Sequence, residues 1–347
     1  MNLDFLSRRY LKWSAGNPPP PIPATVAKTG AGSEGRMPFT HYANVIPVYL
    51  FALETLTKLS KTKLRPAILD HGCGTGRLLA FLAHELPQAR FTGIDESPAC
   101  IDYAQKHYPS NNLRFYVDHT NPQTLFSRKL TQAPTPENYT STKPGSAPID
   151  QLRKFDLVVS SHVLEHVPPR NADSYLASLK QLLKPDGILV LGTPNRKWLQ
   201  DLFVKNPRDR KLLRLILPHE HEYTYAELEN LFSHHFQSHT IYGLKNPANA
   251  RFSLASVRSL LPHSDSQFQI RARVSALNLF RLLLPQNLTD FIGRNATAKI
   301  LARLNISYAD LLIKNQPLKD FSSGLNFIVL ASTAKPPSPS SRPSPPA

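Results

Sequence analysis

Short apolar runs alternate with stretches of helical periodicity through the first two thirds of the chain. Five runs have the length and the Val, Ile, Leu and Phe content of buried strands, at residues 67–70, 91–95, 113–118, 155–160 and 188–193. The clearest helical patterns lie between them, at 77–85, 98–106 and 172–183. This alternation predicts an α/β fold with a doubly wound, mostly parallel sheet, whose ligands bind at the carboxyl ends of the strands.

Three stretches lack this pattern. Residues 1–36 hold a run rich in Pro, Gly and Ala and predict a flexible N-terminal segment. Residues 120–154, which include TQAPTPENYTSTKPGSAP, predict a disordered surface insertion. Residues 336–347, which include PPSPSSRPSPPA, predict a disordered tail. The ordered elements are therefore expected outside these three stretches.

A glycine-rich loop follows the first predicted strand in DHGCGTGRLL, with Gly72, Gly74 and Gly76. Glycine allows sharp turns and close approach to a ligand, and the helix that follows presents free N–H donors. A dinucleotide fingerprint would need a glycine at position 77, where Arg77 stands, and no phosphate loop of the GxxxxGK[ST] type occurs. The loop therefore argues against NAD and against the simplest nucleoside triphosphatase.

Acidic residues end the next two strands. Asp95 is placed to accept hydrogen bonds from both hydroxyls of a ribose, and Asp118 to accept one from the exocyclic amine of an adenine. A glycine loop without the third dinucleotide glycine, combined with a ribose acid, favours a nucleoside ligand that lacks a pyrophosphate. S-adenosylmethionine (SAM) is the common ligand of this kind.

The segment SSHVLEHVPP contains HVLEH, which matches the H-x-x-E-H pattern of one group of zinc proteases. Such a protease needs both histidines on one face of a regular helix. Here the pattern directly follows a predicted strand, and Pro168 and Pro169 limit any helix to little more than one turn. Its position therefore disfavours the protease.

Four segments in order, ILDHGCGTGRLL, FTGIDES, FDLVVSSHVLEHV and LLKPDGILVLGTPN, resemble the successive motifs of the class I SAM-dependent methyltransferases, over about Ala67 to Phe236. The resemblance implies a seven-stranded Rossmann-like sheet that finishes with strands at 240–244 and, antiparallel, at 325–333, so that the domain comprises 37–244 and 325–335. It also implies a cofactor site with Asp95 on the ribose, Asp118 near the adenine and Ser161 against the cofactor. The methionine end would be surrounded by Asp70, Gly72, Gly74 and Gly76.

The L-E-H after the fourth strand resembles the subgroup that includes the ubiquinone-type O-methyltransferases and methyltransferase domains of types 11, 12 and 23. In the quinone enzymes the corresponding stretch resembles E-V-L-E-H, and its acids and His are associated with a divalent metal. His162 stands here in place of the first Glu. A divalent metal is therefore an open question, with no ligands assigned.

Methyl transfer from a sulfonium is an in-line displacement, and a hydroxyl acceptor must also lose its proton to a base. His162, Glu165 and His166 are the first candidates, because they leave the fourth strand beside the expected methyl group. His219 and His221 form a second cluster, before a helix whose capping box is Thr224 and Glu227, and rank below them. The alternative for each histidine is a surface or packing residue.

Composition bears on the cellular location and the charge of the protein. The chain has two cysteines, no apolar run long enough for a transmembrane helix and no uninterrupted apolar core of a secretory signal, which favours the cytoplasm. Organelle targeting stays open, because Asp4 is the only acid before Glu34. The formal net charge is +16, and more than half of the excess follows Phe236.

Residues 245–324 are expected to form a helical, basic insertion or cap before the last strand. Its apolar stretch at 276–284 lies among basic residues, which suits peripheral contact with an anionic membrane surface. A plain helical subdomain is the alternative.

The sequence thus predicts a SAM-dependent methyltransferase that acts on a hydroxyl of a small-molecule or lipid-linked acceptor. The rivals are an RNA or protein methyltransferase, although no nucleic-acid-binding module is recognisable, and a catalytically silent SAM-binding protein. The identity of the acceptor and the oligomeric state are left open.

Overall fold

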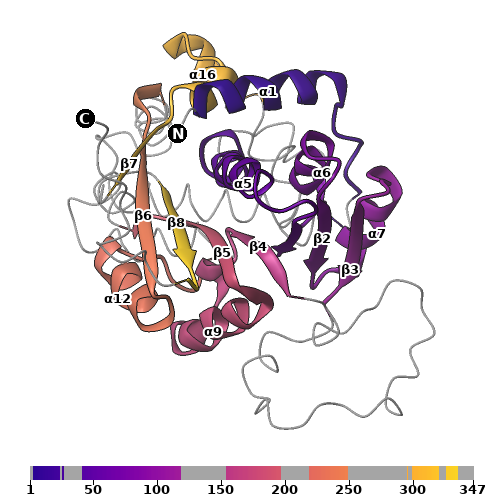
Figure 1. The fold of residues 1–347 in the computed structure, drawn as a ribbon. Coiled ribbons are helices and arrows are strands. Elements are labelled where there is room, and N and C mark those ends of the chain that lie inside the picture. Colours follow the sequence, from indigo (N-terminus) through magenta and orange to yellow (C-terminus); the bar gives the residue numbers. More distant parts are fainter. Residues whose placement is uncertain are drawn as a thin grey trace, which may run out of the picture.

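The computed structural model describes residues 3–23, 26, 41–118, 154–196, 219–248, 295, 299–319 and 326–334. Its centre is a sheet with the strand order β3-β2-β1-β4-β5-β8-β6-β7 (Figure 1). The first five strands in this order pair in parallel, whereas β8 is antiparallel to β5 and β6, and β7 is antiparallel to β6. The strands are β1 (Ala67–His71), β2 (Arg90–Asp95), β3 (Leu113–Val117), β4 (Phe155–Ser161), β5 (Leu183–Pro194), β6 (Ser238–Lys245), β7 (Gln316–Lys319) and β8 (Asn326–Ser332).

Helices cover both faces of the sheet, as the apolar runs predict. All seven residues of β4 are buried; Leu157 and Val159 belong to one apolar cluster and Val158 to the other. The first cluster includes residues of three helices, α5 (Ile46–Leu59), α6 (Arg77–Glu85) and α7 (Pro98–His107). The second includes residues of α9 (Ala172–Leu182) and α12 (Tyr225–His235), across the sheet from α5 and α6 (Figure 1). The prediction of a doubly wound, mostly parallel sheet is confirmed.

Helix α1 (Leu3–Gly16) corrects the expectation that residues 1–36 are flexible throughout. Its buried apolar residues recur at helical spacing and belong to the same apolar cluster as residues of α5 and α6. The rings of Tyr10 and Trp13 pack against Phe81 of α6, with centroid separations of 5.2 and 5.4 Å. The prolines and glycines that follow dominated the composition of the segment and hid this amphipathic pattern.

The sheet has eight strands where seven were expected. The additional strand, β7, belongs to the segment 245–324 that was predicted to be helical, and it extends the edge of the sheet beside β6. The other described parts of this segment include α16 (Tyr308–Ile313). The residues of β7 are mostly exposed and carry no apolar pattern, so main-chain pairing with β6 defines this strand.

The apolar stretch at 276–284 and the tail at 336–347 lie outside the described residues, as does nearly all of the insertion at 120–154. Within the part of the chain that the structure describes, no helix is long and apolar enough to cross a membrane.

The register brings the polar strand ends to one edge of the sheet. Asp70 of β1 is the partner of Gly93 in β2 and of Val159 in β4. Because these strands are parallel, Asp70, Asp95 and Ser161 lie at the same carboxyl edge. Ser161 is in turn paired with Gly192 of β5, which extends this edge toward β8.

Candidate active site

The glycine loop after β1 has a backbone that only glycine adopts readily. Gly72, Gly74 and Gly76 have φ angles of 80°, 54° and 75°. A Cβ atom on Gly72 would lie 2.5 Å from Cγ2 of Val163, in the turn that follows β4. The glycines therefore allow the backbone conformation of this turn, and Gly72 also lets the turn pack closely against the segment that carries His162 and His166.

Asp95 connects this loop to β2. Its Oδ2 accepts a hydrogen bond from the N–H of Gly74 at 2.8 Å, and its Oδ1 accepts one from the N–H of Ser97 at 3.0 Å. Burial raises the pKa of Asp95, although these two bonds oppose the shift. Asp118 directly follows β3, and its N–H donates to the carbonyl of Asp95 at 2.8 Å. Both acids predicted for the nucleoside thus stand at the β2–β3 side of the loop.

Asp70, at the end of β1, is a buried carboxyl group. Its Oδ2 accepts a hydrogen bond of 2.8 Å from the hydroxyl of Tyr49 in α5, while its Oδ1 has no hydrogen-bond partner among the described residues. Burial raises the pKa of Asp70 to about 7, against the opposing effect of the Tyr49 hydrogen bond. Tyr49 was not predicted from the sequence, because it is one residue of an apolar helix and only the tertiary packing places it on Asp70.

The chain turns sharply where β4 ends. Ser161 is buried, and its Oγ has no hydrogen-bond partner in the described structure. His162 has a φ of 59°, and the 3-10 helix that follows spans only Leu164–His166. His162 is therefore outside any helix that contains His166, which excludes the zinc-protease arrangement.

Glu165 is the central group of this turn. Its side chain is fully buried, with Oε1 2.8 Å from Nδ1 of His162 and Oε2 3.2 Å from the hydroxyl of Thr193, which donates to it. Burial acts to raise the pKa of Glu165, but the charge and hydrogen bonding of His162 outweigh it, and the net pKa is lowered. The carboxylate is therefore ionised at neutral pH.

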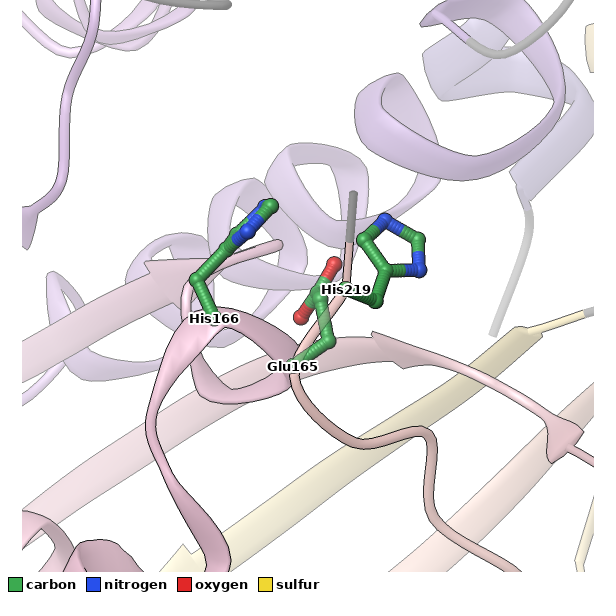
Figure 2. A group of neighbouring side chains, drawn as sticks. All are labelled: Glu165, His166 and His219. Carbon is green, nitrogen blue, oxygen red and sulfur yellow. The ribbon is translucent and has the colours of Figure 1, made fainter. Parts of the chain in front are cut away.

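Main-chain hydrogen bonds bring the second histidine cluster to this turn. The N–H groups of Glu220 and His221 donate to the carbonyl of Glu165 at 2.9 and 3.1 Å. The rings of His166 and His219 consequently meet edge to face, with centroids 5.1 Å apart. Figure 2 shows the carboxylate of Glu165 between these two rings.

Glu165, His166 and His219 are also a fitting set of metal ligands. One ligand atom from each lies within 4.8 Å of the other two. A carboxylate oxygen and two imidazole nitrogens suit divalent metals such as zinc, manganese or ferrous iron. His162, at the position of the first Glu in the E-V-L-E-H of the quinone enzymes, is not part of this group. A hydrogen bond of 2.9 Å to Glu222 and the charge of Glu165 raise the pKa of His219, although burial opposes the shift.

His221, which the sequence grouped with His219, lies elsewhere. Its Nε2 is 3.4 Å from both Nη1 of Arg196 and Oε1 of Glu227, and it is not part of the metal-ligand group. The predicted capping box of Thr224 and Glu227 is confirmed. Tyr223 was not predicted: its hydroxyl is buried without a hydrogen-bond partner among the described residues, and burial raises its pKa to about 12.

Unsatisfied buried polar atoms gather along this edge. Within the described structure they include the side-chain atoms Oδ1 of Asp70, Oγ of Ser161 and Nε2 of His162. Buried polar atoms in native proteins normally have partners, so a concentration of such atoms indicates where a ligand binds. Together with the glycines of positive φ and the strand-end acids, these residues form a polar edge whose chemistry fits SAM, a ligand with ribose hydroxyls and a cationic amino-acid end.

Comparison with known proteins identifies the family of the chain. Residues 43–250 match a family model described as "Methyltransferase domain". The ubiquinone biosynthesis O-methyltransferase of Haemophilus ducreyi is 35% identical over 129 residues, which are 37% of this chain and 45% of that protein. The malonyl-[acyl-carrier protein] O-methyltransferase of Acetivibrio thermocellus is 27% identical over 154 residues, 44% of each chain. The chain thus spans about half the length of these curated relatives. The solved structure of the cyclopropane synthase MmaA2 from Mycobacterium tuberculosis has a TM-score of 0.45 at 14% identity, covering 85% of this chain and 90% of that chain.

The fold and the glycine loop have the arrangement of a class I SAM-dependent methyltransferase domain. The family match extends over more than half of the residues, and the chain belongs to the methyltransferase-domain family.

Proposed function

We propose that this chain transfers the methyl group of SAM to a hydroxyl of a small-molecule or lipid-linked acceptor. The observation that carries the proposal is the pairing of His162 with Glu165. Nδ1 of His162 lies 2.8 Å from the buried carboxylate, and its Nε2 is buried with no hydrogen-bond partner in the described residues. A carboxylate that faces one ring nitrogen orients the imidazole and leaves the other nitrogen as a base. This arrangement suits the removal of a proton from a hydroxyl.

We assign the cofactor to the carboxyl edge of β1, β2 and β4. SAM supplies the methyl group as part of a sulfonium. Asp95 accepts hydrogen bonds from the ribose hydroxyls, and Asp118 accepts one from the adenine amine. Asp70 and the glycine loop with Gly72, Gly74 and Gly76 surround the methionine end, and Ser161 lies against the cofactor after β4.

His162 acts as the base in this proposal. Its Nε2 takes the hydroxyl proton while the new C–O bond forms and the C–S bond breaks. Glu165, ionised because its pKa is lowered, stabilises the resulting imidazolium. A base of this kind contributes a factor of about 10²–10⁴ to the rate. The alignment of acceptor and methyl group along the edge contributes about 7–11 kcal/mol to lowering the barrier.

Glu165, His166 and His219 would hold a divalent metal. A metal bound there would act as a Lewis acid that favours the ionised form of an acceptor hydroxyl. The test is calorimetric titration of the metal-free protein with Zn²⁺ and with Mn²⁺. His219→Ala should weaken binding at least tenfold, of the order seen when ligand shells are disturbed. His221→Ala should leave the affinity unchanged, and equal effects of the two variants would contradict the assignment.

The relatives support the class of acceptor. Two proteins with different named substrates, one in ubiquinone biosynthesis and one a malonyl-[acyl-carrier protein], are both called O-methyltransferases. An oxygen acceptor is therefore shared between them while the rest of the substrate differs.

A radiolabelled-methyl assay on cell extract, separated into RNA, protein, lipid and small molecules, tests the proposal. We expect label in the lipid or small-molecule fraction, as an alkali-stable methyl ether. Label confined to RNA or to protein would contradict the proposed acceptor and identify that class of macromolecule as the acceptor instead. Label in no fraction would favour a catalytically silent SAM-binding protein. His162→Gln should lower turnover about 10²–10⁴-fold without weakening S-adenosylhomocysteine (SAH) binding. The exposed His84→Gln is the matched control.

We also propose that the protein is located in the cytoplasm and contacts an anionic membrane surface through its basic segment 245–324. Most of this segment lies outside the described residues. Sedimentation with anionic and with neutral liposomes at low salt tests it, since basic surfaces bind anionic lipids and release them as the salt concentration rises. Equal recovery with both kinds of liposome would contradict this contact.

A further inference from the structure

Asn44 and Asn326 are two buried amides whose hydrogen bonding is incomplete. Asn326 is 0% exposed and begins β8, and Asn44 is 9% exposed and belongs to the π-helix His41–Val45 before α5. Nδ2 of Asn326 donates to the main-chain carbonyl of Asn44 at 3.3 Å, which joins the two residues. The Oδ1 atom of each side chain is buried without a hydrogen-bond partner among the described residues. Buried amide oxygens normally accept hydrogen bonds, so this pair lacks a donor.

Strand pairing places Asn326 on the α5 side of the carboxyl edge. Asn326 is opposite Pro194, the last residue of β5. Two residues further along β8, Ile328 is opposite Gly192. Gly192 faces α5, because a Cβ atom on it would lie 2.3 Å from Cγ2 of Val48. Residues two apart along a strand share a face, so Asn326 faces the start of α5.

The same face continues to the turn that carries the proposed base. Ser161 of β4 is opposite Gly192, and the N–H of His162 donates to the carbonyl of Gly192 at 2.9 Å. Oγ of Ser161 is a further buried oxygen without a hydrogen-bond partner in the described structure. Buried oxygens that lack a donor therefore extend from β4, across β5, to Asn326 of β8. Two strand spacings separate β4 from β8, which is about 10 Å.

This half of the edge is the side from which an acceptor approaches in the proposed arrangement. The nucleoside of the cofactor belongs to the ends of β2 and β3, with Asp95 and Asp118. In-line transfer places the acceptor oxygen on the far side of the methyl carbon from the sulfur. An acceptor whose hydroxyl meets His162 therefore extends away from β1, over β5 toward β8, where Asn44 and Asn326 lie.

A second hydroxyl of the acceptor has the hydrogen bonding that this pair lacks. The bond to Asn44 fixes the orientation of the Asn326 amide, so its oxygen needs a donor. No hydrogen bond holds Oδ1 of Asn44 within the described residues, so this amide can turn either its oxygen or its NH₂ group inward. A hydroxyl both donates and accepts, and it satisfies the pair in either case. An ammonium group would place a buried charge between two neutral amides, which is costly.

We propose that Asn44 and Asn326 bind a second hydroxyl of the methyl acceptor and so determine acceptor specificity. The selected acceptors carry one hydroxyl at His162 and another that is not on a neighbouring atom, because β4 and β8 are two strands apart. The pair takes no part in the transfer of the proton or of the methyl group. The inference rests on the proposed function in taking a hydroxyl acceptor at His162.

The experiment compares the binding of two phenols to the SAH complex by NMR titration. Phenols are suitable because their hydroxyl is acidic enough to give its proton to a histidine. 4-(2-Hydroxyethyl)phenol carries a second hydroxyl, whereas 4-propylphenol has a methyl group in its place. Wild type should bind the hydroxyethyl compound about tenfold more tightly, the equivalent of one hydrogen bond to a buried group. Asn44→Leu and Asn326→Leu should each remove most of this preference.

Thermal unfolding of the free protein separates a ligand site from a structural pair. Asn44→Leu removes an unsatisfied oxygen, so the melting temperature should stay within about 2 °C of wild type or rise. The matched control is Asn246→Leu. The buried amide of Asn246 donates to the carbonyl of Leu311 and accepts from the N–H of Ala248, both at 2.9 Å. Its loss should lower the melting temperature by about 5–10 °C and leave the preference between the phenols unchanged.

Equal affinities of the two phenols for the wild-type complex, including no binding of either, would overturn the inference. A preference that survives in both leucine variants at positions 44 and 326 would also overturn it. So would a fall in the melting temperature of Asn44→Leu as large as that of Asn246→Leu, since the amides would then be a structural pair. The expected preference without methyl transfer from SAM to either phenol would instead count against the proposed function alone.

Discussion

Gly72→Ala tests the contact between the glycine loop after β1 and the turn after β4. Gly72 has a φ of 80°, in the left-handed region, where a residue with a Cβ costs about 1–2 kcal/mol. The new Cβ would also lie 2.5 Å from Cγ2 of Val163, and such overpacking adds about 1–3 kcal/mol. The free energy of unfolding should therefore fall by about 2–5 kcal/mol. For a domain of this size the melting temperature should fall by about 5–20 °C.

The two contributions can be separated with Val163→Ala, which removes the methyl group that the new Cβ meets. In the double variant the overlap disappears while the backbone strain at Gly72 remains. A double-mutant cycle by urea unfolding should give a favourable coupling energy of about 1–3 kcal/mol. The matched control is Gly16→Ala, where a Cβ would meet no atom within 4 Å and a change within about 0.5 kcal/mol is expected.

Two results would refute this reasoning. Additive effects of Gly72→Ala and Val163→Ala would mean that the loop and the turn do not touch in solution. Equal stabilities of Gly72→Ala and Gly16→Ala would mean that the left-handed backbone is not required. Val163 immediately follows His162, so Gly72→Ala should also lower methyl-transfer turnover, and the Val163→Ala background should recover part of that loss.

Three further predictions concern the scaffold. Asp156→Asn should lower the free energy of unfolding by about 3–5 kcal/mol at pH 7. The reason is that the buried carboxylate accepts hydrogen bonds from Lys63, from Lys184 and from a main-chain N–H. These contacts outweigh burial and lower the pKa of Asp156, so their stabilisation is present above the usual Asp range and lost as the pH falls through the lowered pKa. The difference from wild type should therefore shrink in urea unfolding at pH 3, and a constant difference would contradict the assignment. Trp13→Ala should cost about 3–5 kcal/mol in thermal unfolding if α1 is packed in the core, whereas Phe5→Ala, 56% exposed, should cost far less. Thr224→Ala should lower stability by about 1 kcal/mol through loss of the capping box, and no change in chemical unfolding would mean that α12 begins elsewhere.

Much of the fold followed from the sequence because its signals are local. A continuous apolar run such as that of β4 is long enough for a strand and is buried on both faces, so the pattern alone identifies it. The glycines at 72, 74 and 76 and the strand-end position of Asp95 are set by neighbouring residues, so local sequence signals reveal them. The resemblance to the methyltransferases adds their expected relation to SAM. Residue spacing also predicted the capping box at Thr224.

The sequence by itself therefore determined the sheet, the glycine loop and the acids at the strand ends, since each depends on residues close together in the chain. Only the tertiary structure decided which side chains meet across elements. It placed His219 beside His166 through hydrogen bonds to the carbonyl of Glu165, left His221 outside that group, and set the hydroxyl of Tyr49 on Asp70. No spacing encodes these contacts, because they depend on how α5 and the loop before α12 pack against the carboxyl edge of the sheet.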